Sequence, residues 1–202
     1  MTTEALRTFS PSRMFLRWTN ATNMPNTAPA TTTMSLRAAW PVLLLLGLSA
    51  CAPEETLRYG PVTVDLRAEG PLFEGPNTAQ ATVDPGIAAF LQVNGATPEQ
   101  LRKATLVSAR LSSQDSIGLA NVGGMSLQVM SEGASAQELG VRNPLPPGAT
   151  VAELELAHAQ DGLAGHLRQT LVTWVADLQL KADEEDDRHI RAELTFELTL
   201  ER

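Results

Sequence analysis

Apolar and polar residues alternate with a period of two along most of the chain after residue 58. The alternation is clearest in residues 171–181 and 190–200, where every second position is apolar. Such a pattern gives a strand one apolar and one polar face, as in antiparallel sheets with a single buried face. Residues 182–189 are too many for a two-residue turn, so we predict a long hairpin with an acidic loop. The same alternation predicts strands in residues 62–68, 106–111, 125–129 and 151–156.

Three segments interrupt this alternation. In residues 161–169, Leu163 and Leu167 lie four positions apart and Asp161 is a candidate N-cap, which predicts one short helix. Thr97 followed by Pro98 is typical of a helix start, so we expect one helical turn there. Residues 87–93 are a short apolar run, which we interpret as a strand.

Together these elements predict a mainly β domain. A sheet with one apolar face must cover that face, and with few helices the cover has to be a second sheet. We therefore predict an antiparallel β-sandwich of about seven or eight strands with one short helix, formed by residues 59–202. No repeat with a period of about 20–50 residues is visible, which argues against a propeller or a solenoid.

Residues 34–51 follow a different pattern. Arg37 precedes the apolar residues 38–50, and small residues close the segment, which is the order of an export signal. The apolar stretch has 13 residues and contains Pro41, so it is shorter than the roughly 17–25 residues of a membrane-spanning helix. Its end, Leu-Ser-Ala-Cys at 48–51, resembles the lipobox of bacterial lipoproteins, in which the cysteine is acylated and becomes the first residue of the mature chain.

The resemblance implies a domain organisation and a location. Residues 34–50 form a cleaved signal peptide, Cys51 carries the lipid, and residues 51–58 form a tether to the β domain. The membrane is then a partner through this lipid anchor, and Ala52 in place of Asp favours the outer membrane, with the domain facing the periplasm or the cell surface. The alternative is a buried core cysteine, which leaves unexplained why the single cysteine follows small residues at the end of the apolar run.

Residues 1–33 precede a signal that normally begins a chain. Residues 19–33 are rich in Thr, Asn, Ala and Pro and contain little to bury, which is typical of disorder. We interpret residues 1–33 as a disordered or mis-annotated extension and Met34 as the initiator. The alternative is an unusually long basic region that carries Arg7, Arg13 and Arg17.

The charge balance excludes one class of partner. The chain has 15 Lys and Arg against 23 Asp and Glu, a net charge of -8. Removal of residues 1–50 takes away four Arg and one Glu, which leaves 11 basic and 22 acidic residues and a net charge of -11. Because nucleic-acid binders gather Lys and Arg on one face, we expect no nucleic-acid partner. A single cysteine also excludes an internal disulfide and a cysteine-rich zinc site.

One cluster suggests a metal ion. Carboxylate oxygens are the ligands that Ca²⁺ prefers, but this run has neither the spacer residues nor the Gly of a calcium loop. We therefore weigh a solvated loop tip above a metal site. The candidates are Asp183, Glu184, Glu185, Asp186 and Asp187.

The three histidines do not have the spacing of a zinc site. His158 and His166 are eight positions apart, across a segment that contains Gly162 and Gly165. We expect both at the surface or in turns, and we expect His189 to be solvated beside Arg188.

The remaining residues predict no enzyme and no cofactor. A Gly-x-Ser-x-Gly motif is absent, and Gly123 and Gly124 lack the Lys and Ser or Thr that complete a phosphate loop. Glu153 and Glu155 share one face of a predicted strand, which is an ordinary solvent-exposed arrangement rather than a glycosidase pair.

Two functions remain open. The first is a structural or protein-interaction module, non-enzymatic and anchored through Cys51, with an envelope protein as its partner. The alternative is a carrier of a lipid or other small apolar ligand between the two sheets, which the aliphatic inner faces suggest. Fold analogy alone does not choose between them.

Overall fold

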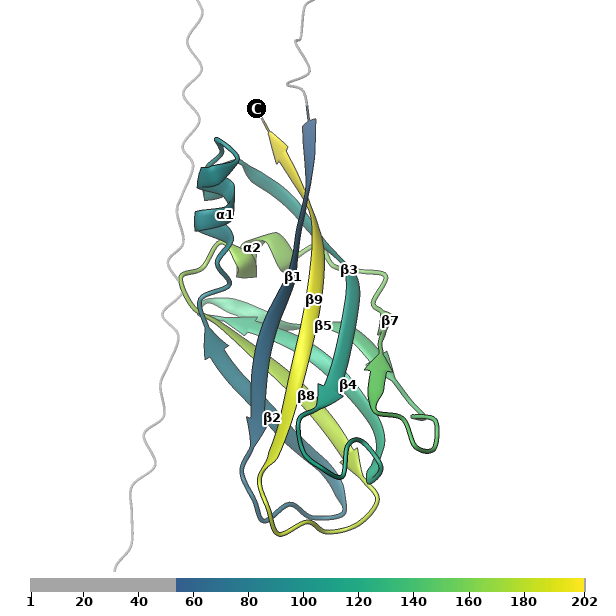
Figure 1. Ribbon diagram of the computed structural model, residues 1–202. Helices are drawn as coiled ribbons and strands as arrows, with labels where there is room; N and C mark the ends of the chain where they lie inside the picture. Colours follow the sequence, from purple (N-terminus) through teal and green to yellow (C-terminus); the bar gives the residue numbers. More distant parts are fainter. Residues whose placement is uncertain (1–53, 202) are drawn as a thin grey trace, which may run out of the picture. The chain divides into compact units, whose positions relative to one another are not determined.

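The computed structural model describes residues 54–201 and is mainly β, as predicted (Figure 1). The predicted extension (1–33), the signal peptide (34–50) and Cys51 lie outside the described residues. The strands are β1 (Glu54–Ala68), β2 (Gly75–Val83), β3 (Leu101–Ser113), β4 (Val122–Ser131), β5 (Ala134–Arg142), β6 (Val151–Glu153), β7 (Glu155–Leu156), β8 (Val172–Leu180) and β9 (Arg188–Glu201). The helices are α1 (Ile87–Val93) and α2 (Leu163–Leu167), with a single 3₁₀ turn, η1 (Pro98–Gln100).

The nine strands form one antiparallel sheet that is nearly closed as a barrel, with the order β6-β3-β9-β1-β2-β8-β4-β5-β7. The two outermost strands are consecutive in the chain and are separated by Leu154 alone, whose N–H donates to the Ala109 carbonyl oxygen at 3.0 Å. This stretch therefore pairs with β3 on one side and with β5 on the other. The predicted sandwich of seven or eight strands in two sheets is not confirmed, because the described strands number nine and belong to one sheet.

The predicted C-terminal hairpin is wrong. β8 pairs with β2 and β4, whereas β9 pairs with β1 and β3, so no ladder joins β8 to β9. The acidic connection carries the chain from one part of the sheet to the other. Between β1 and β2, where the two parts meet, the only paired residues are Arg67 and Gln80. Alternation looks the same in sequence whether two strands pair or pack across a core, because both arrangements bury one face.

The burial of β8 and β9 agrees with the predicted alternation. Trp174 and Phe196 are each 1% exposed, and their ring centroids lie 6.2 Å apart inside the sheet. The inner face of β9 continues through aliphatic residues that are no more than 1% exposed: Ile190, Ala192, Leu194, Leu198 and Leu200. The side chains of the sheet itself thus fill its interior.

Residues 87–93 form helix α1 rather than the strand that we predicted. Ile87 and Leu91, four positions apart, turn to the same side and are buried, and Gly86 allows the left-handed backbone (φ 71°) that precedes the helix. Short apolar runs do not distinguish a strand from a buried helix by periodicity alone. The predicted turn at Thr97 and Pro98 is confirmed as η1, and the predicted helix in residues 161–169 is confirmed as α2. The predicted N-cap is wrong, because Gly162 rather than Asp161 precedes the helix and no side chain caps it.

The chain enters the sheet earlier than expected. Strand β1 begins at Glu54, inside the segment 51–58 that we assigned to a tether, and Glu54 pairs with Glu201 at the end of β9. Within residues 54–201 no helix is both long and apolar enough to cross a membrane.

Candidate functional site

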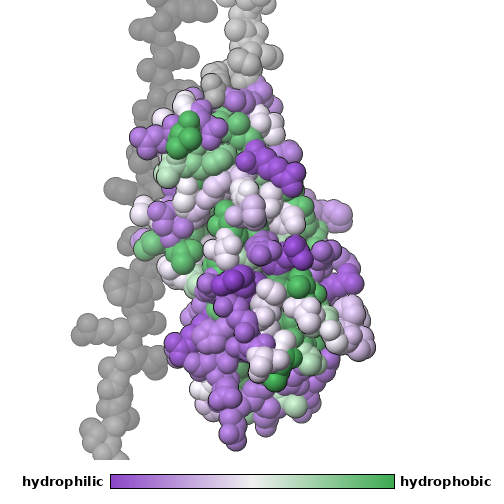
Figure 2. Space-filling view, in the orientation of Figure 1, coloured by the Kyte–Doolittle hydropathy of each residue, from purple (hydrophilic) through white to green (hydrophobic). Residues whose placement is uncertain are grey.

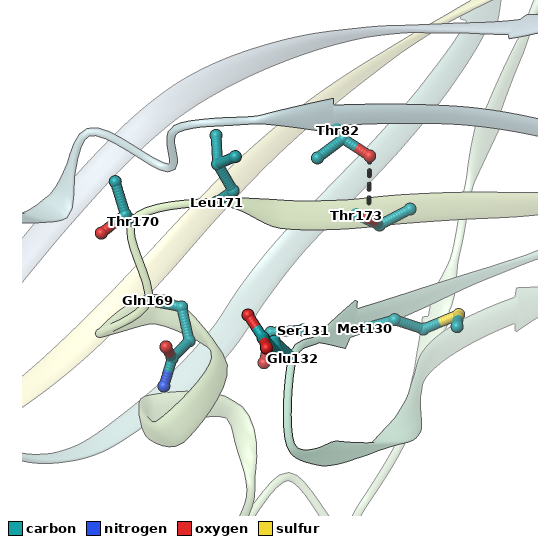
Figure 3. Close-up of a pocket in the computed structure, with 8 residues that line it drawn as sticks. All are labelled: Thr82, Met130, Ser131, Glu132, Gln169, Thr170, Leu171 and Thr173. Carbon is teal, nitrogen blue, oxygen red and sulfur yellow. Dashed lines mark hydrogen bonds between the residues drawn. The ribbon is translucent and has the colours of Figure 1, made fainter.

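A surface depression of about 450 Å³ lies where β2 ends, β4 turns into β5, and α2 leads into β8. Figure 3 shows the three segments that form it, with Thr82 and Thr173 joined by a hydrogen bond of 2.8 Å between their hydroxyl groups. It is lined by Thr82, Met130, Ser131, Glu132, Gln169, Thr170, Leu171 and Thr173.

Tight local geometry builds one wall of this depression. Ser131 pairs with Ala134, so Glu132 and Gly133 form a two-residue hairpin turn between β4 and β5. Gly133 has a φ of 74°, a conformation that glycine adopts without the penalty paid by residues with a Cβ. The opposite wall is the short α2–β8 connection, which contributes Gln169, Thr170 and Leu171.

Two apolar side chains in the lining of the depression are exposed to solvent. Met130 is 42% exposed and Leu171 is 57% exposed, and both belong to its lining. The threonine hydroxyl groups and the Ser131 hydroxyl group supply polar atoms around them. An apolar group fits this combination, because the Met130 and Leu171 side chains lose solvent when it binds.

A buried histidine of α2 forms a hydrogen bond with the hairpin that makes one wall of the depression. His166 is 2% exposed, although we expected it at the surface, and its Nδ1 lies 2.8 Å from the Ser131 Oγ. Burial lowers the pKa of His166, and a hydrogen bond to the backbone of Ser135 opposes that change. Among residues 54–201 no hydrogen bond joins His166 to a carboxylate, so the Ser–His pair lacks the third group of a triad. The pair links α2 to the hairpin and positions Ser131.

Three of the five acidic candidates, Asp183, Glu184 and Asp187, contact separate partners. Asp183 accepts a hydrogen bond from the Glu74 N–H at 2.7 Å, and Asp187 accepts one from the Gly70 N–H at 2.9 Å and pairs with Arg67. Glu185 and Asp186 are exposed. Within residues 54–201 no three His, Cys, Asp or Glu side chains are grouped so that they could hold a metal ion.

Glu184 has a role that sequence reasoning missed. Its carboxylate forms an ion pair with Arg188, whose Nε lies 3.0 Å from the Glu184 Oε2 and whose side chain is fully buried. Arg188 also donates to the Gly118 carbonyl oxygen in the β3–β4 connection. The alternation contained the signal, because Arg188 stands two positions before Ile190 and so faces inward with the apolar residues of β9.

The other sequence candidates lie on the surface and apart from the depression. His158 and His189 are exposed, as predicted. Glu153 and Glu155 are exposed on β6 and β7, and Glu155 pairs with Arg142 at 2.9 Å. None of them lines the depression, whose residues come from three segments without a shared motif.

Comparisons with known proteins leave the family open. No family model matches the chain, and no curated protein matches it. A solved structure described as Desmodium yellow mottle tymovirus is similar over 89% of this chain and 97% of its own, with 11% sequence identity and a TM-score of 0.25. A similarity at that TM-score supports no inference about fold or function.

Proposed function

We propose that the chain is a lipid-anchored protein of the bacterial cell envelope whose β domain acts as a non-enzymatic protein-interaction module. The depression beside Met130 and Leu171 is the observation that carries the proposal, because it presents exposed apolar side chains beside hydroxyl groups. Its proposed occupant is an apolar side chain of an envelope protein. The anchor is Cys51, and the domain faces the periplasm or the cell surface from the outer membrane.

The interior packing favours this module over a carrier. A carrier needs space between inner faces, whereas Trp174 and Phe196 occupy the middle of the sheet and Leu127 and Leu139 are each 0% exposed. Core side chains packed at native density leave few voids larger than a water molecule. An open depression at the surface suits a partner that approaches from outside.

Replacing the anchor residue tests the first half of the proposal. We expect Cys51→Ser to abolish acylation and to move nearly all of the protein from the membrane fraction to the soluble fraction, because each buried CH₂ contributes about 0.8 kcal/mol to membrane binding. Ala52→Ser, at the next position, is the control and should stay in the membrane fraction. Fractionation with intact-mass analysis measures both, and a Cys51→Ser protein that remains on the membrane would contradict the anchor.

Photocrosslinking in cells tests the second half. A benzophenone amino acid at position 130, in the depression, should give one discrete adduct, because a partner side chain lies against it. The same amino acid at Val151, an exposed apolar position of β6 that does not line the depression, is the control and should give none. Adding Leu171→Asp should reduce the adduct about tenfold or more, since a buried unpaired charge costs at least about 1.4 kcal/mol. Equal adducts at positions 130 and 151, or an adduct unaffected by Leu171→Asp, would rule out the depression as the binding surface.

A further inference from the structure

One end of the β domain gathers the start of β1, the end of β9, η1 and α1 (Figure 1). Gln100 of η1 donates from Nε2 to the Glu201 carbonyl oxygen at 3.3 Å, and Glu201 pairs with Glu54. Tyr59 holds α1 to β1: its hydroxyl group donates to the Pro85 carbonyl oxygen at 2.6 Å, and its ring centroid lies 4.7 Å from that of Phe90. We call these elements the α1 end.

One segment of the α1 end is uncharged, although Glu54, Glu99 and Glu201 lie at the same end and are exposed. Residues 85–98 contain no Asp, Glu, Lys or Arg. The buried side of α1 consists of Ile87 and Leu91, whereas Ala88 and Ala89 are exposed and Val93 is 86% exposed. Ala88, Ala89 and Val93 together give the uncharged helix an exposed apolar side, which suits a surface that is less polar than bulk water.

The opposite end of the domain is strongly acidic. It lies roughly 45 Å away along β1, since β1 has 15 residues and each step adds about 3.3 Å. The two loops there, residues 69–74 and 182–187, contain seven Asp and Glu and no Lys or Arg. Figure 2 shows hydrophilic residues over the lower end of the domain, where these loops lie.

The connection between Cys51 and this end is short. Only Ala52 and Pro53 separate Cys51 from Glu54, the first residue of β1. Three steps of at most about 3.6 Å place the Cα of Cys51 within about 11 Å of the Cα of Glu54. A lipid on Cys51 therefore leaves the α1 end little freedom to move away from the membrane surface.

We propose that the α1 end contacts the lipid surface through α1, with Val93 at the level of the headgroups, and that the acidic end points away from it. The proposal rests on the proposed acylation of Cys51. The negative potential of anionic headgroups repels the seven carboxylates of the acidic loops, whereas α1, the element proposed to contact the lipid, carries no charge. The domain then stands on the membrane in one orientation, with its depression beside β2 and β8 open to a partner.

Lipid-attached quenchers test this orientation on the full-length, acylated protein. The Val93→Cys variant carries an environment-sensitive fluorophore in vesicles of phosphatidylethanolamine and phosphatidylglycerol that contain headgroup nitroxides. The matched control is Phe73→Cys, because Phe73 is an apolar residue that is 65% exposed in the β1–β2 connection at the acidic end. We expect quenching at position 93 to exceed that at position 73 by about twofold or more, with a blue-shifted emission, since interfacial side chains lie about 5–10 Å deep.

The intact mass of each protein separates the two possible failures. An acylated protein with equal quenching at both positions overturns the orientation and leaves the anchor in place. A mass without acyl groups on Cys51 overturns the anchor and the orientation together.

Discussion

Replacing Arg188 with Met is expected to destabilise the β domain by about 3–5 kcal/mol, because it leaves the Glu184 carboxylate without the guanidinium that compensates its burial. The Arg188 side chain is 0% exposed and that of Glu184 is 12% exposed, so water replaces little of the lost interaction. The substitution also leaves the Gly118 carbonyl oxygen without its donor. Urea unfolding of the protein in its soluble Cys51→Ser form measures the change.

The control is a second ion pair of the same region. Arg67 and Asp187 have side chains that are 54% and 35% exposed, so Arg67→Ala should cost no more than about 1 kcal/mol. The double variant Arg188→Met with Glu184→Gln removes both charges and should recover about half or more of the lost free energy. Similar losses for Arg188→Met and Arg67→Ala would show that burial does not determine the strength of the Arg188–Glu184 pair.

Truncating Phe196 is expected to have an effect of similar size for a different reason. Phe196 is 1% exposed, and its ring lies 6.2 Å from that of Trp174 and 6.1 Å from that of Tyr59. Phe196→Ala removes apolar contacts and leaves a cavity between the inner faces, which typically costs about 3–5 kcal/mol. The adjacent outward position is the control, because Glu197 is exposed and Glu197→Ala should stay within about 0.5 kcal/mol of the parent.

The Phe196→Ala variant also tests whether the interior of the sheet is closely packed. If the interior is closely packed, Phe196→Ala lowers the free energy of unfolding and leaves the urea m-value unchanged. A loss below about 1 kcal/mol would contradict the packed interior and favour the carrier.

The alternation predicted much of the local structure but not its pairing. Residues 171–181 and 190–200 became β8 and β9 with the expected inner faces, and the turn at Thr97 and the helix in residues 161–169 also formed. Strand β5 was not predicted, because residues 134–138, Ala-Ser-Ala-Gln-Glu, show no alternation of large apolar and polar residues. Residues 87–93 form a helix rather than the predicted strand, and the contacts that hold this helix come from a distant segment. Tyr59 on β1 packs against Phe90 and donates to the Pro85 carbonyl oxygen, 26 positions away in the sequence.

The depression could not be predicted from the sequence either, because distant segments form it. Its residues lie in the segments 82, 130–132 and 169–173, which become neighbours only when β2, β8 and β4 pair side by side. Ser131 and His166 are 35 positions apart and share no motif, so their contact depends on how α2 packs against the hairpin. The buried Arg188 was also missed, because the predicted strand began at Ile190 and left Arg188 in the acidic connection, whereas β9 begins at Arg188.

The sequence by itself determined which positions of each long strand are apolar, and therefore which face of β8 and β9 turns inward, because side chains alternate by covalent geometry. It also determined the order of basic, apolar and small residues before Cys51, on which the proposed anchor depends. Only the tertiary structure decided that the nine strands of residues 54–201 join in one sheet, that β8 and β9 do not pair, and that Glu184 forms an ion pair with a buried Arg188. These features depend on contacts between distant segments, which form when the whole core excludes water and which no local pattern specifies.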